Sequence, residues 1–245
     1  MPIRAVAFDI DGTLYPEWGF FLRQFPLCLR SPLLCFAYWK VRRDLRVHDL
    51  YDPPLQREQA RRVLQLLGRS SGEAAVERME RLLHQRLYRH WDRLFLGMKP
   101  FAGVREALEQ LRAQGYALAA LSDFPVGNKL QVLGLEDLFT LFFSAEEIGY
   151  LKPSRMPFCA LAEELGYAVE EILYVGNSVS KDILGARTAG MPAALIQASG
   201  RLREPVVLAD PGDDCTQPHI RFSSYQQLPE AAARLRQLTE QGGAD

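Results

Sequence analysis

Two aspartates lie two residues apart after an apolar run near the start of the chain, in the stretch Val6-Ala7-Phe8-Asp9-Ile10-Asp11-Gly12-Thr13-Leu14. The run is short and apolar, which is typical of a buried strand. Strand alternation sends Asp9 and Asp11 the same way, whereas a turn at Gly12 would spread them around one small volume. Burying two unpaired acids is costly without a cation, and Mg²⁺ prefers oxygen ligands. For two acids alone, a strand end facing water is the alternative.

Polar residues also follow three later apolar runs. They are Ser122-Asp123, then Lys152, then Gly176-Asn177-Ser178 with Asp182 one turn later. In an open parallel sheet, ligands bind beyond the carboxyl ends of the strands. Each feature alone has an ordinary explanation, because a serine after a strand is usually a helix cap. Together, in this order, they predict one functional site.

The elements that must position these residues alternate between strand and helix from Lys99 onward. After the first strand, the expected strands are 117–121, 139–143, 171–175 and 193–196. The expected helices run from Pro100 to Gly115, from Pro153 as the first helical residue to Gly166, from about Ser178 to Gly190, and over about 229–238. Residues 198–219 are rich in Pro, Gly and Asp and are expected to form a surface loop. The alternation predicts an α/β fold, a Rossmann-like parallel sheet with helices on both faces.

Residues 16–97 have a different pattern, in which the helical period dominates. We therefore expect a helical cap at 16–97, inserted into a catalytic core made of residues 1–15 and 98–245. The insert has 15 Lys and Arg against 9 Asp and Glu, a net charge of +6, in a chain of net charge −1. Such segregation can steer anionic substrates toward the cleft between the two parts, although a solvated helical face is an equally good explanation.

Composition narrows the possible partners and location. The chain has 245 residues and a net charge of −1, so its overall charge gives no reason to expect a nucleic-acid partner. The apolar region 20–39 contains charged residues and two prolines, which makes it a poor membrane span. Arg4 and Asp9 interrupt the first apolar run, so we expect no signal peptide. The four cysteines form no CxxC pair and are expected to be reduced, which favours a cytoplasmic protein.

With these motifs in order, the sequence resembles the haloacid-dehalogenase superfamily of phosphohydrolases over nearly the whole chain except the helical insert and the 198–219 loop. The stretch from Asp9 to Leu14 is similar to the first motif of that family, and Ser122 to its second. Lys152 is similar to the third motif, and Gly176-Asn177-Ser178 with Asp182 to the fourth. The insert stands where one subclass of the family carries a helical cap.

The resemblance implies roles for individual residues. Asp9 would be the nucleophile that forms an aspartyl-phosphate, and Asp11 the general acid and base. The other implied groups are phosphate binding by Ser122, Asp123 and Lys152, support from Gly12 and Thr13, and a Mg²⁺ site formed by Asp9, Asp11, Asn177 and Asp182. Asp11 would contribute its backbone carbonyl to the metal. Thr13 could orient Asp11 by a hydrogen bond or simply cap a turn.

These roles predict a Mg²⁺-dependent phosphatase that hydrolyses a small phosphorylated metabolite. Asp11 favours phosphoryl transfer, because dehalogenating relatives have a different residue there and halide departure needs no proton. Asn177 departs from the family, which usually has Asp at this position, so the metal site would have lost one negative charge. Two alternatives remain: a sugar phosphomutase of the same family, or a weakened, non-catalytic phosphate-binding or partner-binding protein. The sequence indicates neither the substrate nor the oligomeric state.

Overall fold

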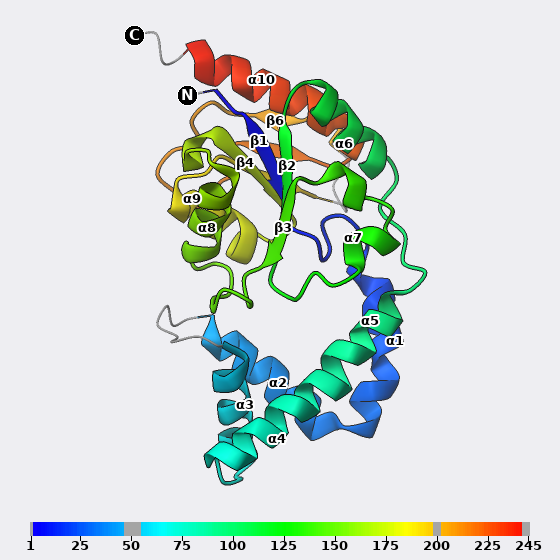
Figure 1. Ribbon diagram of the computed structural model, residues 1–245. Helices are drawn as coiled ribbons and strands as arrows, with labels where there is room; N and C mark the ends of the chain where they lie inside the picture. The colour runs from blue at the N-terminus through cyan, green and yellow to red at the C-terminus, as the bar shows by residue number, and fades with distance from the viewer. Residues whose placement is uncertain (1, 47–54, 198–201, 242–245) are drawn as a thin grey trace.

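The computed structural model describes residues 2–46, 55–197 and 202–241. Figure 1 shows two lobes: one has a central sheet with helices around it, and the other consists of helices α1 to α5. Within the described residues, no helix has the length and apolar character needed to cross a bilayer. All four cysteines are free thiols.

The sheet contains seven strands among the described residues, in the order β3-β2-β1-β4-β5-β7-β6. Their bounds are β1 Ala5–Phe8, β2 Ala117–Ser122, β3 Leu141–Ser144, β4 Ile172–Gly176, β5 Ala193–Ile196, β6 Val206–Val207 and β7 Ile220–Phe222. All neighbouring pairs are parallel except β6 with β7. The mostly parallel sheet covered by helices confirms the predicted α/β fold class.

Strand β1 lies between β2 and β4, so both of its edges are paired and both of its faces are buried. Val6 and Phe8 face the core shared with α6 (Val104–Ala113) and α10 (Leu228–Gln241). Ala5 and Ala7 face the core shared with α8 (Met156–Leu165) and α9 (Leu184–Ala189). This central position fixes the direction in which the chain leaves the strand at Asp9.

The second lobe is built from helices α1 Glu17–Arg30, α2 Pro32–Leu45, α3 Leu55–Leu66, α4 Glu73–Leu83 and α5 Arg89–Phe95. A π-helical segment, His84–Tyr88, joins α4 to α5. These helices share an apolar cluster of their own, which also includes Leu151 from the other lobe. The division into core and cap remains a prediction about how the two lobes behave.

Several boundaries differ from the sequence expectations; β3, for example, begins at Leu141 and not at residue 139. Pro153 does not begin a helix: Ser154 N donates to Leu151 O at 3.0 Å, which closes a turn, and α8 begins only at Met156. Helix α6 begins at Val104 rather than Pro100, because Gly103 has a φ of +81° and cannot be an interior helical residue.

The predicted 198–219 loop is also wrong in part. Residues 198–201 lie outside the described residues, but β6 (Val206–Val207) pairs with β7 at the sheet edge. Leu208 N donates to His219 O at 2.8 Å and continues this pairing. A strand of two residues among prolines and aspartates has no alternation pattern, so its sequence resembles a loop.

Candidate active site

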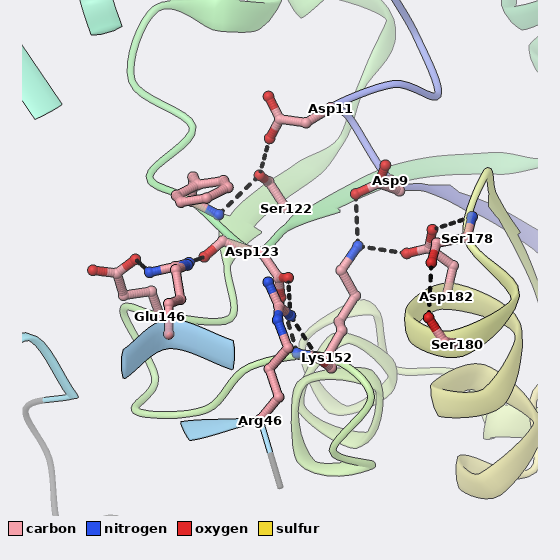
Figure 2. Close-up of polar contacts among 12 residues, drawn as sticks. Asp9, Asp11, Arg46, Ser122, Asp123, Glu146, Lys152, Ser178, Ser180 and Asp182 are labelled. Atoms are coloured by element: carbon pink, nitrogen blue, oxygen red, sulfur yellow. Dashed lines mark hydrogen bonds and ion pairs between the residues drawn. The ribbon is translucent and has the colours of Figure 1, made fainter. Parts of the chain in front are cut away.

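The carboxyl ends of β1, β2 and β4 meet at one edge of the sheet, where Lys152 lies between two aspartates (Figure 2). Its ammonium donates to Asp9 Oδ1 at 2.6 Å and to Asp182 Oδ1 at 2.7 Å. The ammonium also contacts the hydroxyl of Tyr174 at 3.1 Å. All three charged side chains are buried, with Lys152 at 2% exposure. The structure therefore brings together three of the residues that the sequence predicted.

Burial and charge shift the ionisation of this cluster. Burial raises the pKa of Asp9 to about 7, with further increases from Asp182 and Asp11, while Lys152 acts to lower it. Burial alone would lower the pKa of Lys152, but Asp182 and Asp9 outweigh that effect and raise it well above its ordinary value. The site thus holds a permanent cation and an excess of carboxylates.

Asp11 points away from this cluster and is held by donors of its own. Its carboxylate accepts hydrogen bonds from Ser122 Oγ at 2.8 Å, Tyr15 OH at 2.6 Å and Lys129 Nζ at 2.7 and 2.8 Å. Burial acts to raise the pKa of Asp11, but Lys129 and the hydrogen bonds outweigh it, so the pKa lies below its ordinary value. Ser122 is thereby placed between Asp11 and the backbone N–H of Phe124, from which it accepts a bond of 3.1 Å.

The turn at Gly12 brings the side chain of Thr13 into contact with Asp9. Thr13 Oγ1 donates to Asp9 Oδ2 at 2.8 Å. It therefore orients Asp9 and not Asp11, which was one of the two roles that the sequence left open for Thr13. Gly12 makes the turn with a φ of +83°, and a Cβ there would lie 2.2 Å from the side-chain nitrogen of Asn177. The left-handed backbone conformation favours glycine at this position. Asn177 itself is exposed beside the turn.

Asp123 has a role that its phosphate-binding assignment did not foresee. Its carboxylate accepts a bond of 2.9 Å from the backbone N–H of Lys152 and pairs with Arg46, which directly follows helix α2. Burial would raise the pKa of Asp123, but Arg46 and Lys152 lower it to about 2. An ionised carboxylate donates no hydrogen bond, so this side chain does not suit a phosphate oxygen. It fixes the backbone that carries Lys152.

A second buried ion pair joins the two lobes. The Arg42 guanidinium, on α2, donates to Glu146 Oε2 at 2.6 Å and to the backbone oxygen of Asp123 at 2.6 Å. Tyr88 also donates to Glu146. The side chains of Arg42 and Glu146 are 1% and 0% exposed. We call the contacts of Arg42 and Arg46 with Asp123 and Glu146 the α2 clamp.

Sequence reasoning missed Lys129 and the α2 clamp. Lys129 lies six residues after Asp123, at the start of the short helix α7 (Lys129–Val132), and no spacing rule connects it to Asp11. Arg42 occupies a position on α2 between apolar residues, but its partner Glu146 is 104 positions away along the chain. One feature of the sequence could have indicated that Arg42 is buried: it lies on the same face of α2 as the apolar residues Tyr38, Val41 and Leu45.

The side-chain oxygen atoms near Asp9 suit a Mg²⁺ ion that is bound by only a few protein ligands. Asp9, Asn177 and Asp182 line a cleft of about 30 Å³, which has room for one small ion or water. No three carboxylate, histidine or cysteine side chains within the described residues gather as metal ligands. Mg²⁺ usually keeps several waters and needs only one or two carboxylates.

A family model for haloacid dehalogenase-like hydrolases matches residues 3–190. A glyceraldehyde 3-phosphate phosphatase from Methanopyrus kandleri is 31% identical, and the match covers 95% of this chain and 98% of that protein. A phosphoglycolate phosphatase from Yersinia pestis is 26% identical over 89% of this chain and 90% of its own length. Among solved structures, a 2-haloacid dehalogenase from Pseudomonas syringae has a TM-score of 0.62 at 24% identity, covering 95% of this chain and 99% of that chain.

Proposed function

The chain belongs to the haloacid dehalogenase-like hydrolase family, and we propose that it is a Mg²⁺-dependent phosphatase whose nucleophile is Asp9. The observation that carries this proposal is that two aspartates lie at the same edge of the sheet and are oriented by different sets of hydrogen-bond donors. Asp9 is held by Lys152 and Thr13, and Asp11 by Ser122, Tyr15 and Lys129. Curated relatives along most of the chain are named as phosphatases, which supports the same reaction class.

In the first step, an oxygen of Asp9 attacks the phosphorus of the monoester, and the bond from phosphorus to the alcohol oxygen breaks. Asp11 gives its proton to the departing alkoxide, and because its pKa is held low, the protonated form that does so is the minority form at neutral pH. In the second step, Asp11 takes a proton from water, and the resulting hydroxide attacks the aspartyl-phosphate and releases Asp9 with inorganic phosphate. Covalent capture divides one difficult step into two easier ones.

The remaining residues supply charge and orientation. The transferring phosphoryl group carries negative charge on three oxygens, so catalysis depends mainly on positioning and cation contacts. Lys152 provides a buried positive charge beside Asp9. The hydroxyl of Ser122, which donates to Asp11, would redirect that hydrogen bond to a phosphoryl oxygen. A bound Mg²⁺ would neutralise phosphoryl charge, and Asp9, Asp182 and Asn177, with the backbone carbonyl of Asp11, would hold it.

We also propose that residues 16–97 act as a cap over this site, with residues 1–15 and 98–245 as the core. Arg42 and Arg46 join α2 directly to the loops that carry Asp123 and Glu146. Closure of such a cap excludes water and completes the site. The proposed substrate is a small phosphorylated molecule that reaches Asp9 beneath the cap.

The metal requirement can be tested with Asn177→Asp. Phosphate release from p-nitrophenyl phosphate should require Mg²⁺ and stop with EDTA. Because an added carboxylate restores a charged ligand, the half-saturating Mg²⁺ concentration should fall by roughly tenfold in Asn177→Asp. Ser180→Asp adds the same charge at an exposed position of the π-helical segment Val179–Ile183, three residues later, and should leave that concentration unchanged. Absence of phosphate release from the wild type would reject the phosphatase, and an unchanged Mg²⁺ requirement in Asn177→Asp would remove Asn177 from the metal site.

A second test uses Lys129→Gln to shift the ionisation of Asp11. Lys129 opposes the effect of burial and lowers the pKa of Asp11, so its loss should raise that pKa. Asp11 must be protonated to act as the acid, and activity is lost as pH rises through its pKa. The alkaline limb of the kcat/KM profile should therefore move to higher pH in Lys129→Gln. The exposed Lys99→Gln should not move it; a profile unchanged in both variants would argue against Asp11 as the acid.

A further inference from the structure

A cavity of about 300 Å³ adjoins Asp11, between helices α1, α2 and α5 and the loop after β2. Eight of its described lining residues are aromatic, among them Tyr15, Phe20, Trp39, Trp91, Phe95 and Phe124. They come from both lobes, so both lobes form the wall of the cavity. Because the cavity adjoins Asp11, the proposed acid, it lies where the alcohol part of the substrate would be held.

The aromatic wall is held by ring-to-ring contacts. Trp91 meets Phe124 edge-on, with ring centroids 5.3 Å apart, and Trp39 meets Phe124 at 5.9 Å. On the other face of the cavity, Tyr15 and Phe95 form a T-shaped pair at 4.9 Å. The guanidinium of Arg42, part of the α2 clamp, lies 4.0 Å from the centroid of the Phe124 ring. Such fixed rings give a preformed apolar pocket rather than one that a ligand must open.

The charges around the cavity disfavour a second anionic group on the substrate. Lys129 is the only Lys or Arg among the described lining residues, and it already binds both carboxylate oxygens of Asp11. The other charged lining residues are the acids Glu17, Asp92 and Glu147. A carboxylate on the leaving group would meet aromatic rings and these acids. It would lose its hydration without gaining a partner.

We infer that the substrate is a phosphate monoester of an alcohol that carries an apolar or aromatic group, which fills this cavity. The inference rests on the phosphatase function proposed above and specifies its substrate class. An apolar cavity of about 150 Å³ is enough to bind benzene, so about 300 Å³ accommodates a substituted ring. The site should discriminate against small carboxylated or polyhydroxylated esters.

The first experiment compares esters that share the phosphate and differ in the alcohol. Purified enzyme with Mg²⁺ should hydrolyse benzyl phosphate with a kcat/KM roughly tenfold or more above that of phosphoglycolate and glyceraldehyde 3-phosphate. The gain should appear mainly in KM, because contacts with the ring are made equally before and during the reaction. Equal or better use of either small polar ester would overturn the inference while leaving the phosphatase function intact.

Two matched variants on α1 test whether the preference for an aromatic ester depends on the cavity. Phe20 is half-buried in the cavity, with its ring centroid 6.3 Å from that of Trp91, whereas Phe25 is 60% exposed on the same helix and does not line the cavity. Phe20→Ser should reduce the preference for benzyl over methyl phosphate several-fold, and Phe25→Ser should leave it at the wild-type value. If Phe20→Ser and Phe25→Ser show the same preference for benzyl over methyl phosphate, then the benzyl ring of the substrate does not bind in this cavity, and the inference is overturned.

Binding of non-hydrolysable analogues separates the pocket from the reaction. Benzylphosphonate should bind the wild-type protein with Mg²⁺ more tightly than methylphosphonate or phosphonoacetate, measured by titration calorimetry, and Phe20→Ser should weaken only the benzyl preference. This result without phosphate release from any ester would reject the proposed function and keep the pocket assignment. Equal affinities for the three phosphonates would reject the pocket assignment, whatever the hydrolysis rates.

Discussion

The Asp9→Asn variant should lose hydrolysis of every phosphate ester by a factor of roughly 10⁴ or more, because an amide cannot form the aspartyl-phosphate. The variant should nevertheless fold. The pKa of Asp9 is raised by burial to about 7, so folding disfavours its ionised form at neutral pH. An amide resembles the protonated acid in shape and charge, and Lys152 keeps Asp182 as a partner at 2.7 Å.

The sign of the stability change follows from this shift. A carboxyl group whose pKa is higher folded than unfolded binds more protons when folded, so the free energy of unfolding falls as pH rises from about 4 to about 7. Asp9→Asn removes that loss, and its melting temperature at pH 7 should equal or exceed the wild-type value. Asp44→Asn, a matched change at an exposed carboxylate on α2, should keep full activity. Wild-type turnover in Asp9→Asn would show that another group attacks phosphorus.

Of the substitutions proposed for this protein, Arg42→Met should cause the largest decrease in the free energy of unfolding, about 3–5 kcal/mol. The substitution leaves Glu146 buried at 0% exposure without its ion-pair partner and removes the bond to the Asp123 carbonyl. Lys40→Met offers a control on the same helix, because Lys40 pairs with Asp44 at 3.8 Å in an exposed position. Exposed pairs contribute about 0–1 kcal/mol, so the control should lose little.

Equilibrium urea unfolding measures both changes. A double variant, Arg42→Met with Glu146→Leu, removes the uncompensated charge as well and should recover part of the loss. If Arg42→Met and Lys40→Met lose the same small amount, then the buried pair does not hold the two lobes together. Recovery in the double variant would show that the unpaired charge, and not lost packing alone, causes the damage.

The sequence predicted those features that depend on local pattern. Val6 and Phe8 in an apolar run indicate a buried strand, and the polar residues after such runs had to meet at one edge of a parallel sheet. The pattern therefore predicted that Asp9, Lys152 and Asp182 lie close together, as they do in the structure. Strands β6 and β7 at one side of the sheet were missed, because strands of two and three residues have no period to detect.

Contacts between distant parts of the chain could not be predicted in this way. Whether Thr13 reaches Asp9 or Asp11 depends on the turn at Gly12, whose φ of +83° no spacing reveals. Arg42 has the residue type of a solvated helix position, and only the approach of Glu146 makes its burial favourable. Lys129 needed the fold of the loop after β2 to reach Asp11.

The α2 clamp also limits how this chain can be recombined with its relatives. Arg42 and Arg46 belong to the helical lobe, while Glu146 and Asp123 belong to the lobe that contains the sheet. Consider a chimaera in which residues 16–97 are replaced by the corresponding segment of a relative. It would leave Glu146 and Asp123 unpaired at the interface between the lobes unless the new segment supplied matching arginines. Transplanting substrate preference between such proteins therefore requires moving the helices and the loops at 123 and 146 as one unit.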